Sequence, residues 1–118
     1  MAVKVINTFY LHDTEIMEDD DVYLLGEWDG WEHSIKMDYN SGEHKYILNP
    51  KRVVPYFDDI TKYVGRTCQY KFKIVNNKTG KVCWKCNECV QTIHNDGWNK
   101  NNILHVIAGS NNLHILMI

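Results

Sequence analysis

The chain has 118 residues, of which 44% are hydrophobic and 24% are charged, and its formal net charge is −2. This length and composition are typical of one folded domain with a real core, and they disfavour a disordered chain. The slight acidity gives no general attraction to nucleic-acid phosphates or anionic membranes. No stretch is apolar for long enough to cross a bilayer or to resemble a secretory signal. We therefore expect a cytoplasmic protein that forms a single domain over residues 1–118.

Short runs of strand-forming residues recur along the chain, separated by turns rich in Gly, Asn and Asp. These runs are residues 3–10, 22–25, 45–48, 70–75, 81–84, 102–107 and 113–116. Short strands separated by such turns are typical of an antiparallel β-sandwich or a small barrel. The pattern predicts an all-β fold.

One segment departs from the strand pattern. Residues 55–65 combine an Asp that can cap a helix, helical apolar spacing and a terminal Gly. Together these features indicate one or two helical turns. We therefore expect a short helical insertion near residues 56–64.

The strand QYKFKI, residues 69–74, alternates polar and apolar side chains. Its even-numbered apolar residues belong in the core, so Lys71 and Lys73 face outward. The next strand carries Trp84, which shares the lysine face in one of two registers that the sequence does not fix. Flat rings stack on the apolar face of a sugar, while ammonium and amide groups bond its hydroxyls. The pattern therefore favours a polyol ligand.

Two tryptophans flank the turn-forming pair in GEWDGW, residues 26–31, and the DGW triplet returns at residues 96–98. Tryptophan is usually at least mostly buried. These rings therefore either fold back into the core or form a platform for a flat ligand.

Four motifs in order resemble carbohydrate-binding module family 48, the glycogen- and starch-binding domains known from the β subunit of AMP-activated protein kinase. The motifs are VYLLGEWDGW, QYKFKI, GKVCW and NKNNILHV, and they lie between Val22 and Val106. The resemblance implies an immunoglobulin-like antiparallel β-sandwich. The related family 20 starch-binding modules, one of which is attached to a glucan phosphatase, share the Tyr-Lys-Phe strand and the following Trp and are a close second.

Carried over position by position, the resemblance implies a glucan-binding set. Its members are Trp31, Lys71, Trp84, Trp98, Asn99 and Asn101. The tryptophans are stacking platforms, and the lysine and asparagines bond sugar hydroxyls. Trp98 has no direct counterpart, but it lies in the loop that cradles the glucan in the family. Trp28 matches an aromatic that packs beneath the turn, so Trp28 is expected to point inward and Trp31 outward.

The chain also departs from the family. The stretch over residues 49–67 is longer than the usual connection and is an insertion or a remodelled edge. The segment over residues 84–98 contains two cysteines, and a third immediately precedes it, although the family needs none of them.

The cysteines allow two interpretations. Cys83, Cys86 and Cys89 recur at every third residue, and Cys68 lies on the neighbouring strand, so four thiolates, or three with His94, would surround a zinc ion. Structural zinc sites are usually built from two separated CxxC pairs, whereas three of these ligands crowd one segment. We therefore expect free or partly buried thiols and no cofactor, with a disulfide among the four only in an oxidising compartment.

Catalytic motifs are missing from the sequence. The two arginines, Arg52 and Arg66, precede every cysteine, whereas a Cys-dependent phosphatase needs an arginine after its nucleophile. No serine lies in a Gly-flanked nucleophile elbow. Glu27 and Asp29 lie in a turn that lacks the cleft glycoside hydrolysis needs. We predict that the chain is not an enzyme.

The sequence therefore predicts a non-catalytic module that binds α-1,4-glucan such as glycogen, starch or malto-oligosaccharide, alone or within a larger enzyme, kinase or phosphatase assembly. The alternative is a β-sandwich protein-interaction or scaffold domain that has lost the sugar site. Lysines interleaved with aromatics also suit single-stranded nucleic acid. The acidic balance and the absence of arginine near the tryptophans disfavour it, and we expect neither a nucleic-acid nor a membrane partner.

Overall fold

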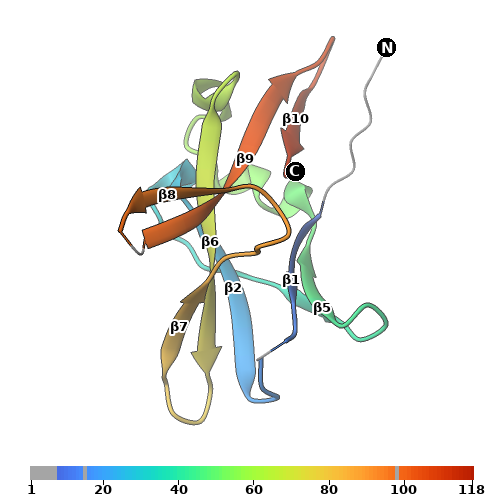
Figure 1. Ribbon diagram of the computed structural model, residues 1–118. Coiled ribbons are helices and arrows are strands. Elements are labelled where there is room, and N and C mark those ends of the chain that lie inside the picture. The colour runs from blue at the N-terminus through green and yellow to red at the C-terminus, as the bar shows by residue number, and fades with distance from the viewer. Residues whose placement is uncertain (1–7, 15, 98) are drawn as a thin grey trace.

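Two antiparallel sheets form the body of the molecule in a computed structural model that describes residues 8–14, 16–97 and 99–118 (Figure 1). The smaller sheet has the order β1-β5-β4, with β1 at Phe9–His12, β5 at Lys45–Leu48 and β4 at Asp38–Asn40. The larger sheet has the order β10-β9-β6-β2-β3, with β7 paired to β6 and β8 paired to β9. Its strands are β2 (Asp20–Gly26), β3 (Ile35–Lys36), β6 (Thr67–Asn76), β7 (Val82–Lys85), β8 (Thr92–Asp96), β9 (Asn99–Ala108) and β10 (Leu113–Leu116).

The core lies between the two sheets. On β6 the residues Tyr70, Phe72 and Ile74 are all buried, as the alternation of this strand predicts. The ring of Phe9, on β1, meets the Tyr70 ring edge to face with centroids 5.0 Å apart. Apolar side chains of both sheets therefore share one interior, and the predicted all-β sandwich is confirmed.

Each predicted strand overlaps an observed one, and the strand predicted at 81–84 is shifted by one residue to β7 at Val82–Lys85. The predicted strands at 45–48 and 113–116 coincide with β5 and β10, and those at 22–25, 70–75 and 102–107 lie inside longer strands. The predicted first strand, residues 3–10, overlaps β1 at Phe9 and Tyr10, and its residues 3–7 lie outside the described residues. Strands β3, β4 and β8 were missed because they are short or lack apolar alternation.

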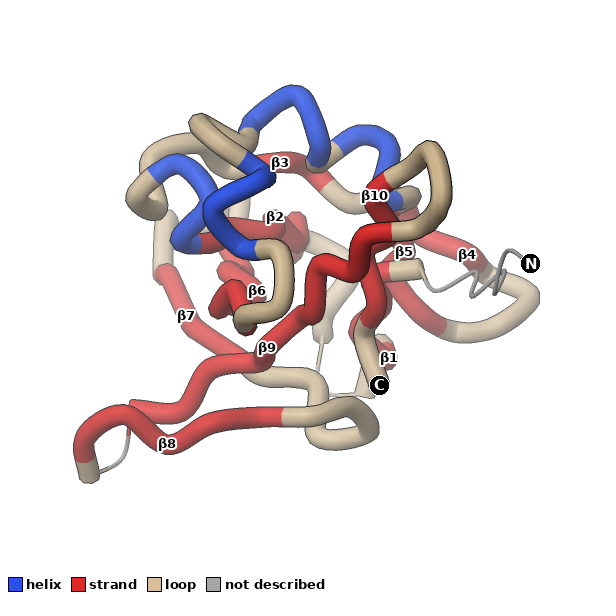
Figure 2. Tube along the Cα trace, turned by 90° about the horizontal axis from the view of Figure 1, so that it is seen from above, coloured by secondary structure: helices blue, strands red, loops and turns tan. Residues whose placement is uncertain are grey.

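The long connection between β5 and β6 forms three 3-10 turns, η2 (Pro50–Arg52), η3 (Val54–Tyr56) and η4 (Ile60–Tyr63). The Asp59 carboxylate caps η4 by accepting from the Thr61 N–H at 3.1 Å. Val53 between the turns is fully buried. The expected helical insertion is thus present as 3-10 turns, which gather on one side of the molecule (Figure 2). Within the described residues, no helix has the length and apolarity needed to cross a membrane.

Trp28 packs beneath the GEWDGW turn, in the 3-10 turn η1 (Glu27–Asp29). Its side chain is 1% exposed and contacts Phe9 and Phe57, with ring centroids 6.2 Å and 5.6 Å away. The indole also lies against Gly26, where an added Cβ would be 2.3 Å from the ring. Only glycine leaves room for the ring at this position, so the expectation that Trp28 points inward is confirmed.

Replacing Trp28 with Ala should lower the free energy of unfolding by about 3–5 kcal/mol, because the buried contacts are lost and a cavity remains. The matched control is Trp31→Ala in the same turn, which should change it by less than about 1 kcal/mol because the Trp31 ring is only partly buried. Urea midpoints of both variants measure the difference. Equal losses for the two variants would contradict the assignment of opposite roles.

Candidate functional site

The largest gathering of the predicted site residues is an open pocket of about 580 Å³ on the outer side of the larger sheet. It is lined by Glu27, Trp31, Gln69, Lys71, Trp84, Asn95, Asn99 and Asn101. Five of these residues were predicted from the sequence, and the sixth predicted residue, Trp98, lies outside the described residues. The structure thus brings together every predicted residue that it describes.

The floor of the pocket is the outer face of β6. The pairing of β6 with β7 sets Trp84 opposite Lys73, so the register places Trp84 on the same face as Lys71. The Trp84 side chain is 45% exposed, which leaves much of its ring available for contact. The conditional expectation that Trp84 shares the lysine face is therefore confirmed.

The turn after β2 presents Trp31 at the pocket rim. The Trp31 N–H donates to the Gly26 carbonyl at 2.9 Å, and its φ of 65° lies in the left-handed region. A bulky residue rarely adopts this conformation, which persists only where its surroundings fix it. The buried Asp29 carboxylate does so by accepting from the backbone N–H groups of Glu32 and His33 at 3.1 Å and 3.2 Å.

Three lining residues were not assigned to the site from the sequence, and they are hydrogen-bonded to one another or to Asn101. The Gln69 N–H donates to Glu27 Oε1 at 2.8 Å, which ties the turn to β6. The Gln69 side-chain oxygen accepts from Asn95 Nδ2 at 2.8 Å and from Asn101 Nδ2 at 2.9 Å. Gln69 faces outward on the same side of β6 as Lys71, and the alternation of QYKFKI could have indicated this. Asn95 carries no such signal, because its position depends on the pairing of β8 with β9.

The chemistry of the pocket suits a neutral polar ligand with apolar faces. Its lining combines two indole rings, four amides, one ammonium and one carboxylate. The two opposite charges, on Lys71 and Glu27, balance, so the lining has no strong preference for an anion or a cation. Amides and charged groups of this kind bond hydroxyls, and the rings offer flat apolar surfaces.

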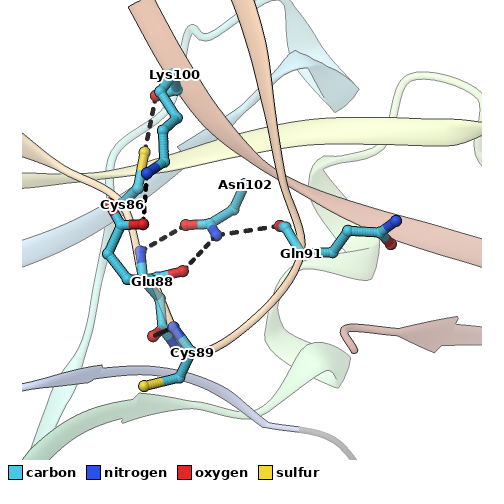
Figure 3. Close-up of polar contacts among 7 residues, drawn as sticks. Cys86, Glu88, Cys89, Gln91, Lys100 and Asn102 are labelled. Atoms are coloured by element: carbon cyan, nitrogen blue, oxygen red, sulfur yellow. Dashed lines mark hydrogen bonds and ion pairs between the residues drawn. The ribbon is translucent and has the colours of Figure 1, made fainter.

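The loop between β7 and β8 is held against β9 by the fully buried Asn102 (Figure 3). Its Oδ1 accepts from the Asn87 N–H at 2.7 Å, and its Nδ2 donates to the carbonyls of Asn87 and Gln91 at 2.8 Å and 3.2 Å. The Lys100 ammonium contacts the Glu88 carboxylate of the same loop. These bonds fix the path from Trp84 on β7 to Asn95 on β8, and so fix one side of the pocket.

Asn102→Ala should lower the free energy of unfolding by at least about 2 kcal/mol, because the buried Asn87 peptide groups would lose their partners. Asn99→Ala, an exposed asparagine on the same strand, is the control and should change it by less than about 0.5 kcal/mol. Chemical denaturation followed by circular dichroism gives both values. A loss for Asn102→Ala no larger than that of the control would show that these bonds do not hold the loop.

The structure does not bring the four cysteines together as one set of metal ligands. Within the described residues, which include all four cysteines and His94, no group of three or more potential ligands is arranged to hold a metal ion. Cys68 lies in the core near the start of β6. Cys83, on β7, pairs with Ile74, which is six residues further along β6. At the rise of a β-strand this separates Cys68 from the position of Cys83 by about 20 Å. The Cys86 thiol donates to the Lys100 carbonyl at 2.7 Å. All four cysteines are free.

The four thiols differ in burial and should therefore differ in reactivity. It raises the pKa of Cys68 far above the ordinary thiol value, with nearby Glu27 adding to the effect, and it also raises the pKa of Cys86. The thiolate is the reactive form, so a raised pKa slows reaction near neutral pH. Cys83 and Cys89 are exposed.

A thiol-specific disulfide reagent at pH 8 should therefore modify Cys83 and Cys89 rapidly, Cys86 slowly, and Cys68 only after denaturation. Mass spectrometry of peptides from timed samples identifies each site. A metal chelator should leave the rates and the melting temperature unchanged. Chelator-dependent exposure of Cys68 would restore the zinc hypothesis.

Comparison with known proteins found no family model, no curated protein and no solved structure that matches this chain.

Proposed function

We propose that the chain is a non-catalytic module that binds α-1,4-linked glucan in the pocket on the outer face of β6. The observation that carries the proposal is the convergence of residues that the sequence resemblance implies. Trp31, Lys71, Trp84, Asn99 and Asn101 come from four separate segments and line one pocket. Strand pairing accounts for part of this meeting, and the position of Trp31 in the turn after β2 completes the set that the resemblance implies.

The physical chemistry of the pocket supports a sugar chain as the ligand. The exposed Trp84 ring and the partly buried Trp31 ring offer apolar surfaces for the flat face of glucose units. Lys71 supplies donors and the asparagines supply donors and acceptors for hydroxyl groups. Because the pocket is open rather than enclosed, a chain can pass across it. The ordering of a flexible ligand offsets much of the contact energy, so a modest affinity is expected.

The same residues support binding without catalysis. Of the two carboxylates in the turn, Asp29 is buried and occupied by backbone donors, which leaves Glu27 as the acidic residue of the pocket lining. Glycoside hydrolysis needs a pair of carboxyl groups flanking the scissile bond. The module would instead bring itself, or an attached enzyme, kinase or phosphatase assembly, to the polysaccharide.

Maltoheptaose or β-cyclodextrin should change the tryptophan fluorescence of the protein in a saturable way, and cello-oligosaccharides should not. Trp84→Ala should weaken binding by at least about tenfold, equivalent to about 1.4 kcal/mol. Lys71→Ala should weaken it by roughly two- to tenfold, the value of about one hydrogen bond.

The matched control is Lys73→Ala, which removes a lysine from the same strand and face. Its ammonium lies 3.3 Å from Ser34 Oγ, and Lys73 does not line the pocket, so its loss should leave the affinity within about twofold of the wild type. The absence of a saturable response at millimolar glucan would contradict the proposal and favour the protein-interaction alternative.

A further inference from the structure

The side chain of Gln69 joins two asparagines from different strands. Its Oε1 accepts from Asn95 Nδ2 of β8 at 2.8 Å and from Asn101 Nδ2 of β9 at 2.9 Å. One oxygen with two lone pairs is thus fully used by two amide donors. Both asparagines line the pocket, as does Gln69 itself.

These bonds determine which end of each asparagine amide remains for a ligand. The nitrogen and oxygen of an amide lie on opposite sides of its carbon, so an amide that directs Nδ2 to Gln69 directs Oδ1 elsewhere. No hydrogen bond within the described residues uses Oδ1 of Asn95 or Asn101. Each asparagine therefore keeps a free acceptor in a pocket-lining side chain.

The Asn101 oxygen is the more informative of the two. The residue is only 6% exposed, and a buried carbonyl without a partner is costly unless water or a ligand reaches it. Among the described side chains, the only polar atom that is sealed from solvent without a partner is Trp28 Nε1. Asn101 Oδ1 is therefore open to solvent, and the space it faces is the pocket that its side chain lines.

The same glutamine is tied to the turn that presents Trp31. Its backbone N–H donates to Glu27 Oε1 at 2.8 Å, and the Glu27 carbonyl accepts from the Tyr63 hydroxyl at 3.2 Å. Displacement of Gln69 would therefore also loosen the turn. The side-chain and backbone bonds of one residue connect three walls of the pocket.

We propose that Gln69 is a positioning residue that holds Asn95 and Asn101 with their carbonyl oxygens toward the ligand, so that the site selects neighbouring hydroxyl donors, and that Asn95 is a further glucan-contacting residue. The inference rests on the proposed glucan binding and adds the acceptor pair that orients the sugar.

Two substitutions of Gln69 test the direction of these bonds. In Gln69→Glu, the carboxylate still accepts from both asparagine nitrogens, so the affinity for maltoheptaose should stay within about threefold of the wild type. In Gln69→Ala, both amides are released, and the affinity should fall by about tenfold. Asn95→Ala removes one contact and should lower the affinity by roughly two- to tenfold. Calorimetric titration at about 0.15 M salt, where long-range charge effects are screened, gives the affinities.

A spectroscopic measurement separates positioning from a general structural role. The side-chain NH₂ signals of Asn95 and Asn101 should show slowed hydrogen exchange in the wild type and in Gln69→Glu, and fast exchange in Gln69→Ala. Urea midpoints establish that each variant is folded at the temperature of the titration.

Three outcomes would overturn the inference. Loss of affinity in Gln69→Glu equal to that in Gln69→Ala would show that Gln69 donates to the asparagines, or only fills space. Wild-type affinity in Gln69→Ala would remove the positioning role while leaving glucan binding intact. Absence of glucan binding by the wild type would remove the proposed function and this inference together, so the two failures are distinguishable.

Discussion

Strand β6 is hydrogen-bonded along both edges, and every wall of the pocket is attached to it directly or through β9. Along one edge it pairs with β2 over Gly26↔Tyr70 to Asp20↔Asn76. Along the other, its first half pairs with β9 and its second half with β7. The turn that carries Trp31 leaves β2 next to this strand, and Trp84 lies on β7. A change in the register of β6 would move both tryptophans relative to Lys71.

The turn after β2 combines two opposite demands within four residues. Trp28 is buried against Gly26, which fixes where the chain leaves the sheet. Trp31 then adopts a left-handed backbone conformation that costs about 1–3 kcal/mol for a residue with a side chain. Burial of Trp28 and the hydrogen bonds of Asp29 oppose that cost. The inward tryptophan is therefore part of the support that allows its neighbour to be displayed.

The core and most of the larger sheet could be predicted because their signals are local. The alternation at residues 70–75 specifies one buried face, and the Gly and Asn turns mark where strands end. Strand β8 could not be predicted in this way, because Thr92–Asp96 has polar and exposed positions along its length. Its partner β9 supplies the hydrogen bonds that make it a strand.

The site was predicted as residue types, but its internal bonds were not. Asn101 and Asn102 are adjacent in sequence, yet one lines the pocket and the other holds a loop, because successive side chains of a strand face opposite sides. The bond from Gln69 to Glu27 spans 42 residues, and no local pattern contains it. The cysteines show the same limit: Cys68 lies on the strand next to Cys83, but the register pairs Cys83 with Ile74, six residues further along β6.

The lining of the pocket runs from Glu27 to Asn101, so it draws on most of the chain and exists only when the larger sheet is complete. A fragment that contains only one of the motifs lacks most of the pocket lining, and a partly folded chain would not bind the ligand. Occupancy of the pocket and integrity of the sheet are then a single linked equilibrium. A ligand at a hundred times its dissociation constant would stabilise the whole domain by about 2.7 kcal/mol. If the proposed glucan binding holds, bound polysaccharide would therefore also stabilise the folded domain against unfolding.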